Sequence, residues 1–413
     1  MDQDDSSLDS LLATAADLKQ RLAFVEREIA QRTQDPAALA AELRSTRSYA
    51  ASATEADCVA RASKALTHYG FTVIDDVIPE ADVPALREEA EAAEITIAEN
   101  QQAVRALMDA AEARGEPSES GLSGELPTGV ELRAVRRRGL APKTPNDIIW
   151  LPRYAQHLAH PTLIAIAKRL LDDHLRIAQL HLRPIKSGGF GSARNNGRQD
   201  TRRWHTDWPH DLSAYGAGDE RLNVGCIRQP FPDVPMCLVM IWYLSDVDED
   251  TAGTFVVPGS HRDPRNPRGP ADDISVSSPV PGDLQVTARA GSVFIQDSRT
   301  WHASAAHNLG PKRVAVVNRW APWWLAVDDY APGGVMDTVC RPINLDEFQA
   351  LPEALQPYLR HVCAEVQDTL QPEVLERAAA AYARTRWGFR FMEERPDEVA
   401  TRNEHIRVAI RTD

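Results

Sequence analysis

The sequence predicts a mainly β core with α-helical flanks, of the jelly-roll or cupin-like kind. Short β-branched and apolar runs, separated by Gly and Pro turns, follow His174 up to about Val327. Seven of the nine tryptophans fall between residues 204 and 324, so the largest buried aromatic surface should lie in this part. Helical patterning precedes and follows it, which predicts N-terminal and C-terminal helical extensions.

Composition restricts the class of partner. With 413 residues the chain can form one elaborated catalytic domain or two closely packed units. The formal net charge of −14 opposes nonspecific attraction to nucleic acid and to anionic membranes, so we expect a small-molecule partner. The first residues lack a secretory signal, and no apolar run is long enough to span a membrane, so the expected location is the cytoplasm. The five cysteines are scattered, which indicates reduced thiols rather than a disulfide or zinc framework.

The N-terminal part, residues 1–64, reads as a helical extension. Apolar residues between Leu11 and Ile29 recur at the alternating spacing of a helical seam. This helix could pack on its own domain or pair two copies as a homodimer, and both alternatives stay open. A second helical stretch is predicted from Ala37 towards His68.

The rest of the chain divides into a core, residues 65–327, and a C-terminal helical extension, residues 328–413. Flanking Gly, Pro and β-branched residues define the expected strands, and polar periodic stretches define the expected helices. The expected strands are Gly70–Pro79, Met236–Leu244, Thr254–Val257, Ser292–Ile295 and Arg313–Trp320, and the expected helices are Ala81–Ala113, His160–His174 and Leu345–Arg384.

The segment Trp204-His205-Thr206-Asp207 places an imidazole and a carboxylate two positions apart. On a strand these two side chains point to one face, where they can occupy neighbouring positions on a divalent metal. A histidine from another strand would complete a 2-His-1-carboxylate facial triad, and His302 is the best candidate. Alone, His-x-Asp is a weak signal.

Arg313 strengthens this reading. It follows His302 by eleven residues and opens an apolar run that predicts the next strand. Because arginine can bind a carboxylate through two parallel hydrogen bonds, Arg313 is placed to bind the far carboxylate of a metal-chelating 2-oxo acid.

At this point the sequence resembles the phytanoyl-CoA dioxygenase family over roughly residues 65 to 325. The similar stretches are Gly70–Pro79, Trp204–Asp207, Gly253–His261 and Ala290–His302 with Arg313. The resemblance implies a double-stranded β-helix with Fe(II), 2-oxoglutarate as cosubstrate and O2. It implies iron binding by His205, Asp207 and His302, and binding of 2-oxoglutarate by Arg313 with help from Ser304. Gln179 and Lys186 resemble polar positions that line the cosubstrate.

The expected reaction is hydroxylation of a C–H bond of a small metabolite, with release of succinate and CO2. Related halogenases replace the carboxylate ligand with Ala or Gly, so the presence of Asp207 favours oxidation over halogenation. Desaturation, cyclisation or epimerisation of a natural-product intermediate would use the same cofactors. A zinc hydrolase and a non-catalytic jelly-roll scaffold are the more distant alternatives.

A local excess of positive charge bears on the substrate. Between Lys186 and Arg203 there are five basic residues against one acidic residue. These residues could attract an anionic substrate or form a solvated loop whose arginines face water, and both alternatives stay open.

Overall fold

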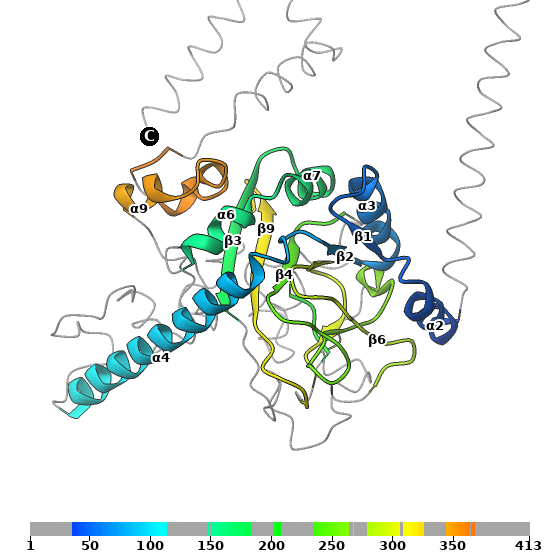
Figure 1. The fold of residues 1–413 in the computed structure, drawn as a ribbon, viewed down its shortest axis with the longest axis horizontal. Coiled ribbons are helices and arrows are strands. Elements are labelled where there is room, and N and C mark those ends of the chain that lie inside the picture. The colour runs from blue at the N-terminus through cyan, green and yellow to red at the C-terminus, as the bar shows by residue number, and fades with distance from the viewer. Residues whose placement is uncertain are drawn as a thin grey trace, which may run out of the picture.

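The structure, a computed structural model, has two β-sheets packed face to face at its centre (Figure 1). The described residues are 35–113, 148, 151–182, 202, 204–207, 234–263, 267, 279–305, 309–325, 344–363 and 365–367. A six-stranded sheet has the order β1-β2-β7-β4-β9-β3, and a three-stranded sheet has the order β6-β5-β8. This arrangement confirms the predicted double-stranded β-helix.

Five of the described strands overlap the predicted runs, whereas the strand expected around His205 and Asp207 is an isolated bridge between His205 and His302. The large sheet is almost entirely antiparallel, with one parallel pair between β1 and β2. Its strands are β1 (Ala50–Ser52), β2 (Phe71–Asp75), β3 (Leu175–Leu182), β4 (Leu238–Tyr243), β7 (Val293–Asp297) and β9 (Ala315–Pro322). The small sheet consists of β5 (Phe255–Val256), β6 (Leu284–Gln285) and β8 (His302–Ala303).

Alternation along the strands gives the large sheet two buried faces. On β4, Met240 and Trp242 pack with the helices in an outer core, whereas Tyr243 packs in an inner core between the two sheets. On β9 and the residue before it, Val314 and Val316 face the outer core and Ala315 faces the inner core. Along β4 and β9, odd-numbered residues therefore point toward the small sheet.

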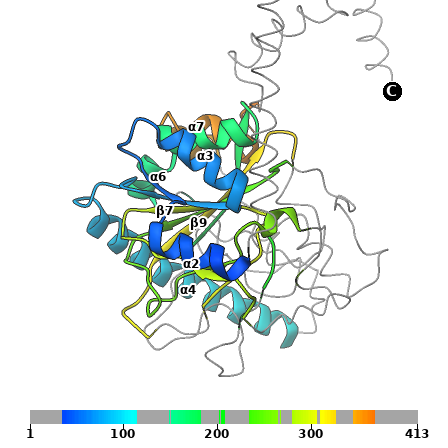
Figure 2. The ribbon, with the colours of Figure 1, turned by 90° about the vertical axis from the view of Figure 1, so that its right-hand side faces the viewer.

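The helices Pro152–Leu158 and Pro161–Leu170 cover the outer face, whereas the helix Pro36–Thr46 lies on the other side of the large sheet and buries Leu43 in the inner core (Figure 2). Tyr154 packs edge-on against Trp242 and exchanges hydrogen bonds with Asn318 of β9, at 3.0 and 3.1 Å. On the same face, Tyr358 lies edge-on against Trp320. The helices are α2 (Pro36–Thr46), α3 (Cys58–Tyr69), α4 (Val83–Ala113), α6 (Pro152–Leu158), α7 (Pro161–Leu170) and α9 (Leu345–Ala350), with short 3-10 turns η4 (Ser260–Arg262), η5 (Gln356–Tyr358) and η6 (Arg360–Val362).

The helix expected from Leu345 to Arg384 is wrong in its described part, because α9 ends at Ala350 and turns with the short 3-10 helices η5 and η6 follow it.

The N-terminal segment corrects another expectation. The single helical stretch predicted from Ala37 towards His68 is wrong, because Arg47 adopts a left-handed conformation at φ 48° and ends α2. Strand β1 follows and pairs with β2, so residues from Ala50 onward belong to the sheet. The division at residue 64 remains a proposal. The Leu11–Ile29 seam lies outside the described residues, so homodimer formation through it stays a prediction.

The long helix α4 begins on the body and extends away from it (Figure 1). Leu86 and Ala90 are buried in the outer core. Glu89 accepts hydrogen bonds from the backbone N–H groups of Arg153 and Tyr154 at 2.8 and 2.9 Å. Since these N–H groups open α6, the carboxylate caps that helix and fixes it to α4. No helix among the described residues is long and apolar enough to cross a membrane.

The loop between β7 and β8 is held by buried polar contacts. The backbone N–H of Asp297 and the hydroxyl of Thr300 both donate to the Gly70 carbonyl, each at 2.9 Å. Gly70 has φ 83°, and a Cβ there would lie 2.5 Å from the Thr300 hydroxyl and 2.6 Å from His261 Nδ1. A residue without a side chain is therefore required at the position that anchors this loop.

His261 should make stability depend on pH. Desolvation lowers its pKa from 6.5 to about 4, so in this window the unfolded chain binds more protons than the folded one. Folding stability should therefore be full above pH 6.5 and fall as the pH drops towards 4, by about 3 kcal/mol in total. Urea unfolding at several pH values measures this. His261→Gln keeps a donor for the Thr67 carbonyl and should flatten the profile. An equally steep loss in the variant would show that another group is responsible.

Candidate metal centre

Two histidines from separate segments are held side by side. The backbone N–H of His205 donates to the His302 carbonyl at 3.0 Å, and the N–H of His302 donates back at 2.9 Å. The two residues thus form an isolated antiparallel bridge, which places their side chains on one face. Their ring centroids are 4.1 Å apart.

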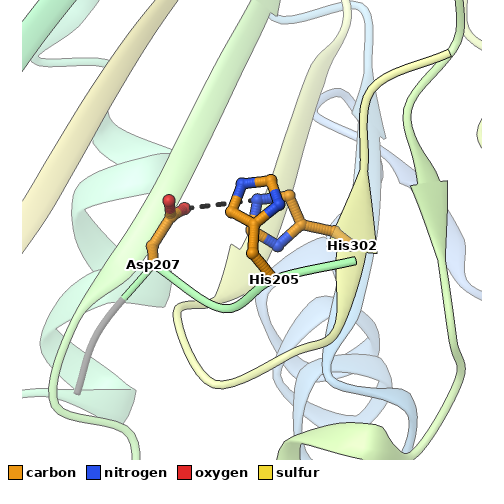
Figure 3. A group of neighbouring side chains, drawn as sticks. All are labelled: His205, Asp207 and His302. Atoms are coloured by element: carbon orange, nitrogen blue, oxygen red, sulfur yellow. Dashed lines mark ion pairs between the residues drawn. The ribbon is translucent and has the colours of Figure 1, made fainter. Parts of the chain in front are cut away.

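Asp207 completes the group (Figure 3). Its backbone N–H donates to the Ser298 carbonyl at 2.9 Å, which ties it to the loop before β8. Its Oδ2 lies 3.6 Å from His302 Nε2. The ligand atoms of His205, Asp207 and His302 all lie within 4.8 Å of one another. Asp207 and His302 are buried and His205 is half-buried, so the three side chains lie at the edge of the protein interior.

The protonation of His302 suits a metal ligand. Its Nδ1 lies 3.0 Å from the Thr300 carbonyl, which can only accept, so Nδ1 carries the proton. The lone pair of Nε2 therefore points toward Asp207 and His205. Such a carbonyl contact is the usual way in which proteins orient a histidine ligand.

The donor set fits iron. Two imidazoles and one carboxylate on one side of a centre form the facial triad of non-haem Fe(II) sites, which leaves positions open for other ligands. Closed structural zinc sites instead use a full tetrahedral set of protein ligands.

Arg313, the residue expected to bind the cosubstrate, lies in the protein interior. Its side chain is buried, and Nη1 donates to the Ala252 carbonyl at 2.7 Å. Ala252 has a left-handed backbone at φ 62°. Before it, Asp248 Oδ1 accepts from the N–H groups of Asp250 and Thr251 at 2.9 and 2.8 Å. This turn holds the carbonyl that orients Arg313.

The same contacts explain the acidic triplet Asp246, Asp248 and Asp250. Hydrogen bonds from Thr251 lower the pKa of Asp248, and Asp246 Oδ1 accepts from the Ala290 N–H at 2.8 Å. Two of these three carboxylates are therefore engaged in holding turns.

Sequence reasoning missed Tyr243 beside Arg313. It is fully buried on β4 opposite Ala315, and desolvation raises the pKa of its hydroxyl. The positive charge of Arg313 opposes that increase in pKa. Its signal in the sequence was the alternation along β4, which turns Tyr243 inward once Met240 and Trp242 turn outward.

Sequence reasoning also missed two residues that contact Asp207. Arg319 Nη2 donates to Asp207 Oδ1 at 2.6 Å, and Gln296 Nε2 donates to Asp207 Oδ2 at 3.4 Å. Arg319 of β9 and Gln296 of β7 both pair with Val239 of β4, so they share the inner face. The available signal was the even spacing between Arg313 and Arg319, which puts both on one face of a strand.

The structure describes the other three predicted residues only in part. Ser304 follows β8 and is half-buried. The backbone of Gln179 pairs with that of Arg319, but its side chain lies outside the described part. Lys186 lies outside the described residues, and the roles of all three stay predictions.

Arg202 is the described member of the basic segment between Lys186 and Arg203. It forms an ion pair with Asp283 at 3.1 Å, and its guanidinium carbon lies 3.9 Å from the ring centroid of Phe255. These contacts favour a structural role for Arg202 over substrate attraction.

Comparison with known proteins gives the following similarities. The family model for phytanoyl-CoA dioxygenase (PhyH) matches residues 66–314, more than half of the 413 residues. Uncharacterized protein Rv1501 of Mycobacterium tuberculosis is 31% identical over 113 residues, which are 27% of this chain and 32% of that protein. Uncharacterized protein Mb1539 of Mycobacterium bovis shows the same values, so the chain covers about a third of these relatives.

Two of the solved structures that match the chain do so at low identity and low TM-score. The non-heme alpha ketoglutarate dependent epimerase SnoN from nogalamycin biosynthesis has a TM-score of 0.38 and 16% identity, over 68% of this chain and 92% of that one. HygX from Streptomyces hygroscopicus, with nickel and 2-oxoglutarate bound, has a TM-score of 0.37 and 17% identity, over 63% and 85%.

Proposed function

Because the chain belongs to the phytanoyl-CoA dioxygenase (PhyH) family of 2-oxoglutarate-dependent non-haem iron oxygenases, we propose that it hydroxylates a C–H bond of a small metabolite. One oxygen atom of O2 would enter the substrate and the other would enter succinate, with loss of CO2 from 2-oxoglutarate. The convergence of His205, Asp207 and His302, with ligand atoms within 4.8 Å, carries this proposal.

Each residue has a defined part. His205, His302 and Asp207 would hold Fe(II), and bound iron supplies the activation of O2 for oxidation of the substrate. The Thr300 carbonyl keeps the proton of His302 on Nδ1, so Nε2 is available as a ligand. Arg313 would bind the far carboxylate of 2-oxoglutarate, and its burial on the inner face strengthens that charge-assisted contact.

Asp207 favours oxidation over halogenation and does not choose among the oxidations that these cofactors permit. A carboxylate at this position occupies the place that a halide takes in related halogenases. Desaturation, cyclisation and epimerisation would use the same ligands, since these reactions differ in where the substrate hydrogen lies. The mass of the product separates them into three groups, because hydroxylation adds one oxygen atom, desaturation and oxidative cyclisation each remove two hydrogen atoms, and epimerisation leaves the mass unchanged.

Anaerobic titration tests the class of site before any substrate is known. Addition of Fe(II) and then 2-oxoglutarate should produce the weak visible charge-transfer absorption of a metal-chelated 2-oxo acid. His205→Ala should lose this band, because it removes a metal ligand. Candidate substrates should then cause 2-oxoglutarate-dependent O2 uptake, with oxygen from labelled O2 in the product. A wild-type protein without the band and without such O2 uptake would overturn the proposal.

A further inference from the structure

Asp207 forms a buried ion pair with Arg319, a residue that has no role in the proposed chemistry. The side chains of Asp207 and Arg319 are 10% and 9% exposed, and Arg319 Nη2 lies 2.6 Å from Asp207 Oδ1. Burying an arginine on the inner face of a sheet is costly unless the charge is paired and hydrogen-bonded. Its placement beside one of three proposed metal ligands therefore calls for a role.

The pair makes the two oxygens of Asp207 unequal. Oδ1 accepts the short, charge-assisted bond from Arg319. Oδ2 instead lies 3.6 Å from His302 Nε2, the proposed ligand atom, and receives a longer contact of 3.4 Å from Gln296 Nε2. One oxygen is thus held by the guanidinium while the other faces the histidine lone pair.

We propose that Arg319 is a positioning residue that makes Asp207 a metal ligand through Oδ2 alone. This inference rests on the proposed function, and it deepens the account of the same site. A carboxylate that rotates freely can bind a metal through both oxygens and then occupies two adjacent positions. With Oδ1 held by Arg319, half of an octahedral metal's positions stay open, as a chelating 2-oxo acid together with O2 requires.

The position of Arg319 on β9 separates its role from that of Arg313. The two arginines are six residues apart and point to the same face, which corresponds to about 20 Å along an extended strand. Arg313 bonds the Ala252 carbonyl, whereas Arg319 bonds Asp207. Arg319 on β9 and Arg313, two residues before that strand, therefore supply separate cations for the metal ligand and for the cosubstrate, and variants at the two positions should have different effects.

The test uses Co(II) alone, without 2-oxoglutarate, on the full chain. Calorimetry measures its affinity, and the visible d–d absorption reports its coordination number. Arg319→Gln should weaken Co(II) binding by about 10- to 100-fold, the usual effect of losing a group that orients a ligand. Its spectrum should also change, because the released carboxylate can bind through both oxygens. Arg319→Lys should restore part of the affinity and the wild-type bands. Arg289→Gln removes the exposed Arg289–Asp76 pair and should leave both measurements unchanged.

The outcomes separate the positioning role from the metal centre itself. If wild type binds Co(II) and His205→Ala does not, but Arg319→Gln matches wild type in affinity and spectrum, the positioning role is overturned while the triad stands. If wild type binds no better than His205→Ala, both proposals fail. Should Arg319→Gln not fold, Arg319→Lys decides by affinity: Co(II) binding weaker than that of wild type supports the role, and wild-type affinity overturns it.

Discussion

Replacing Asp207 with alanine should abolish Fe(II) binding and destabilise the metal-free protein by about 3–5 kcal/mol. The first effect follows from loss of a ligand. The second follows because Arg319 would keep its charge in a buried position without the carboxylate that lies 2.6 Å away. Anaerobic calorimetry with Fe(II) measures the first effect, and urea unfolding of the metal-free variant measures the second.

A double variant separates the two effects. Asp207→Ala combined with Arg319→Met removes both charges and should recover most of the lost stability while still binding no iron. As a matched control, Arg289→Ala breaks an arginine–aspartate pair whose arginine side chain is 72% exposed, and it should cost less than about 1 kcal/mol. If metal-free Asp207→Ala unfolds at the wild-type urea concentration, the buried pair contributes nothing to stability.

Two of the three proposed metal ligands were predictable from the sequence because they lie close together in it. His205 and Asp207 are two residues apart, and in an extended segment this spacing turns them to one side, although of the two only His205 takes part in β pairing, as an isolated bridge to His302. The distant ligand, His302, was a candidate by residue type, and the resemblance to a family supported it, since nothing in local geometry pairs residues so far apart. Arg319 was not predicted. Alternation puts it on one face with Arg313, but its partner depends on how the segment around Asp207 crosses the large sheet.

The fold shows the same division between local and tertiary causes. Strands β4, β7 and β9 were predicted because β-branched and aromatic residues between Gly and Pro turns favour strands wherever they pack. Strand β1 was missed because its sequence, Ala50-Ala51-Ser52, favours a helix over a strand. Its extended conformation comes from pairing with β2, where Ala50 lies opposite Val73 and Ala51 opposite Ile74. Such tertiary pairing overrides local propensity.

Replacing Arg313 with leucine should weaken 2-oxoglutarate binding by about 30-fold or more, equivalent to about 2 kcal/mol. Arg313 is buried on the inner face, so the far carboxylate of 2-oxoglutarate would be left there without a cation. Fe(II) binding should not change, because Arg313 contacts the Ala252 carbonyl rather than a proposed ligand. Titrating 2-oxoglutarate into the anaerobic Fe(II) protein measures the affinity through the charge-transfer band.

Arg313→Lys distinguishes charge from geometry at the same position. Lysine keeps the positive charge but lacks the planar fork that binds a carboxylate through two bonds, so its affinity for 2-oxoglutarate should lie between those of wild type and Arg313→Leu. Comparison with Arg319→Gln completes the test, because that variant should change the metal and Arg313→Leu should change the cosubstrate. If Arg313→Leu keeps wild-type affinity for 2-oxoglutarate, the cosubstrate uses another cation, and the inner face of β9 makes Arg319 the first to test.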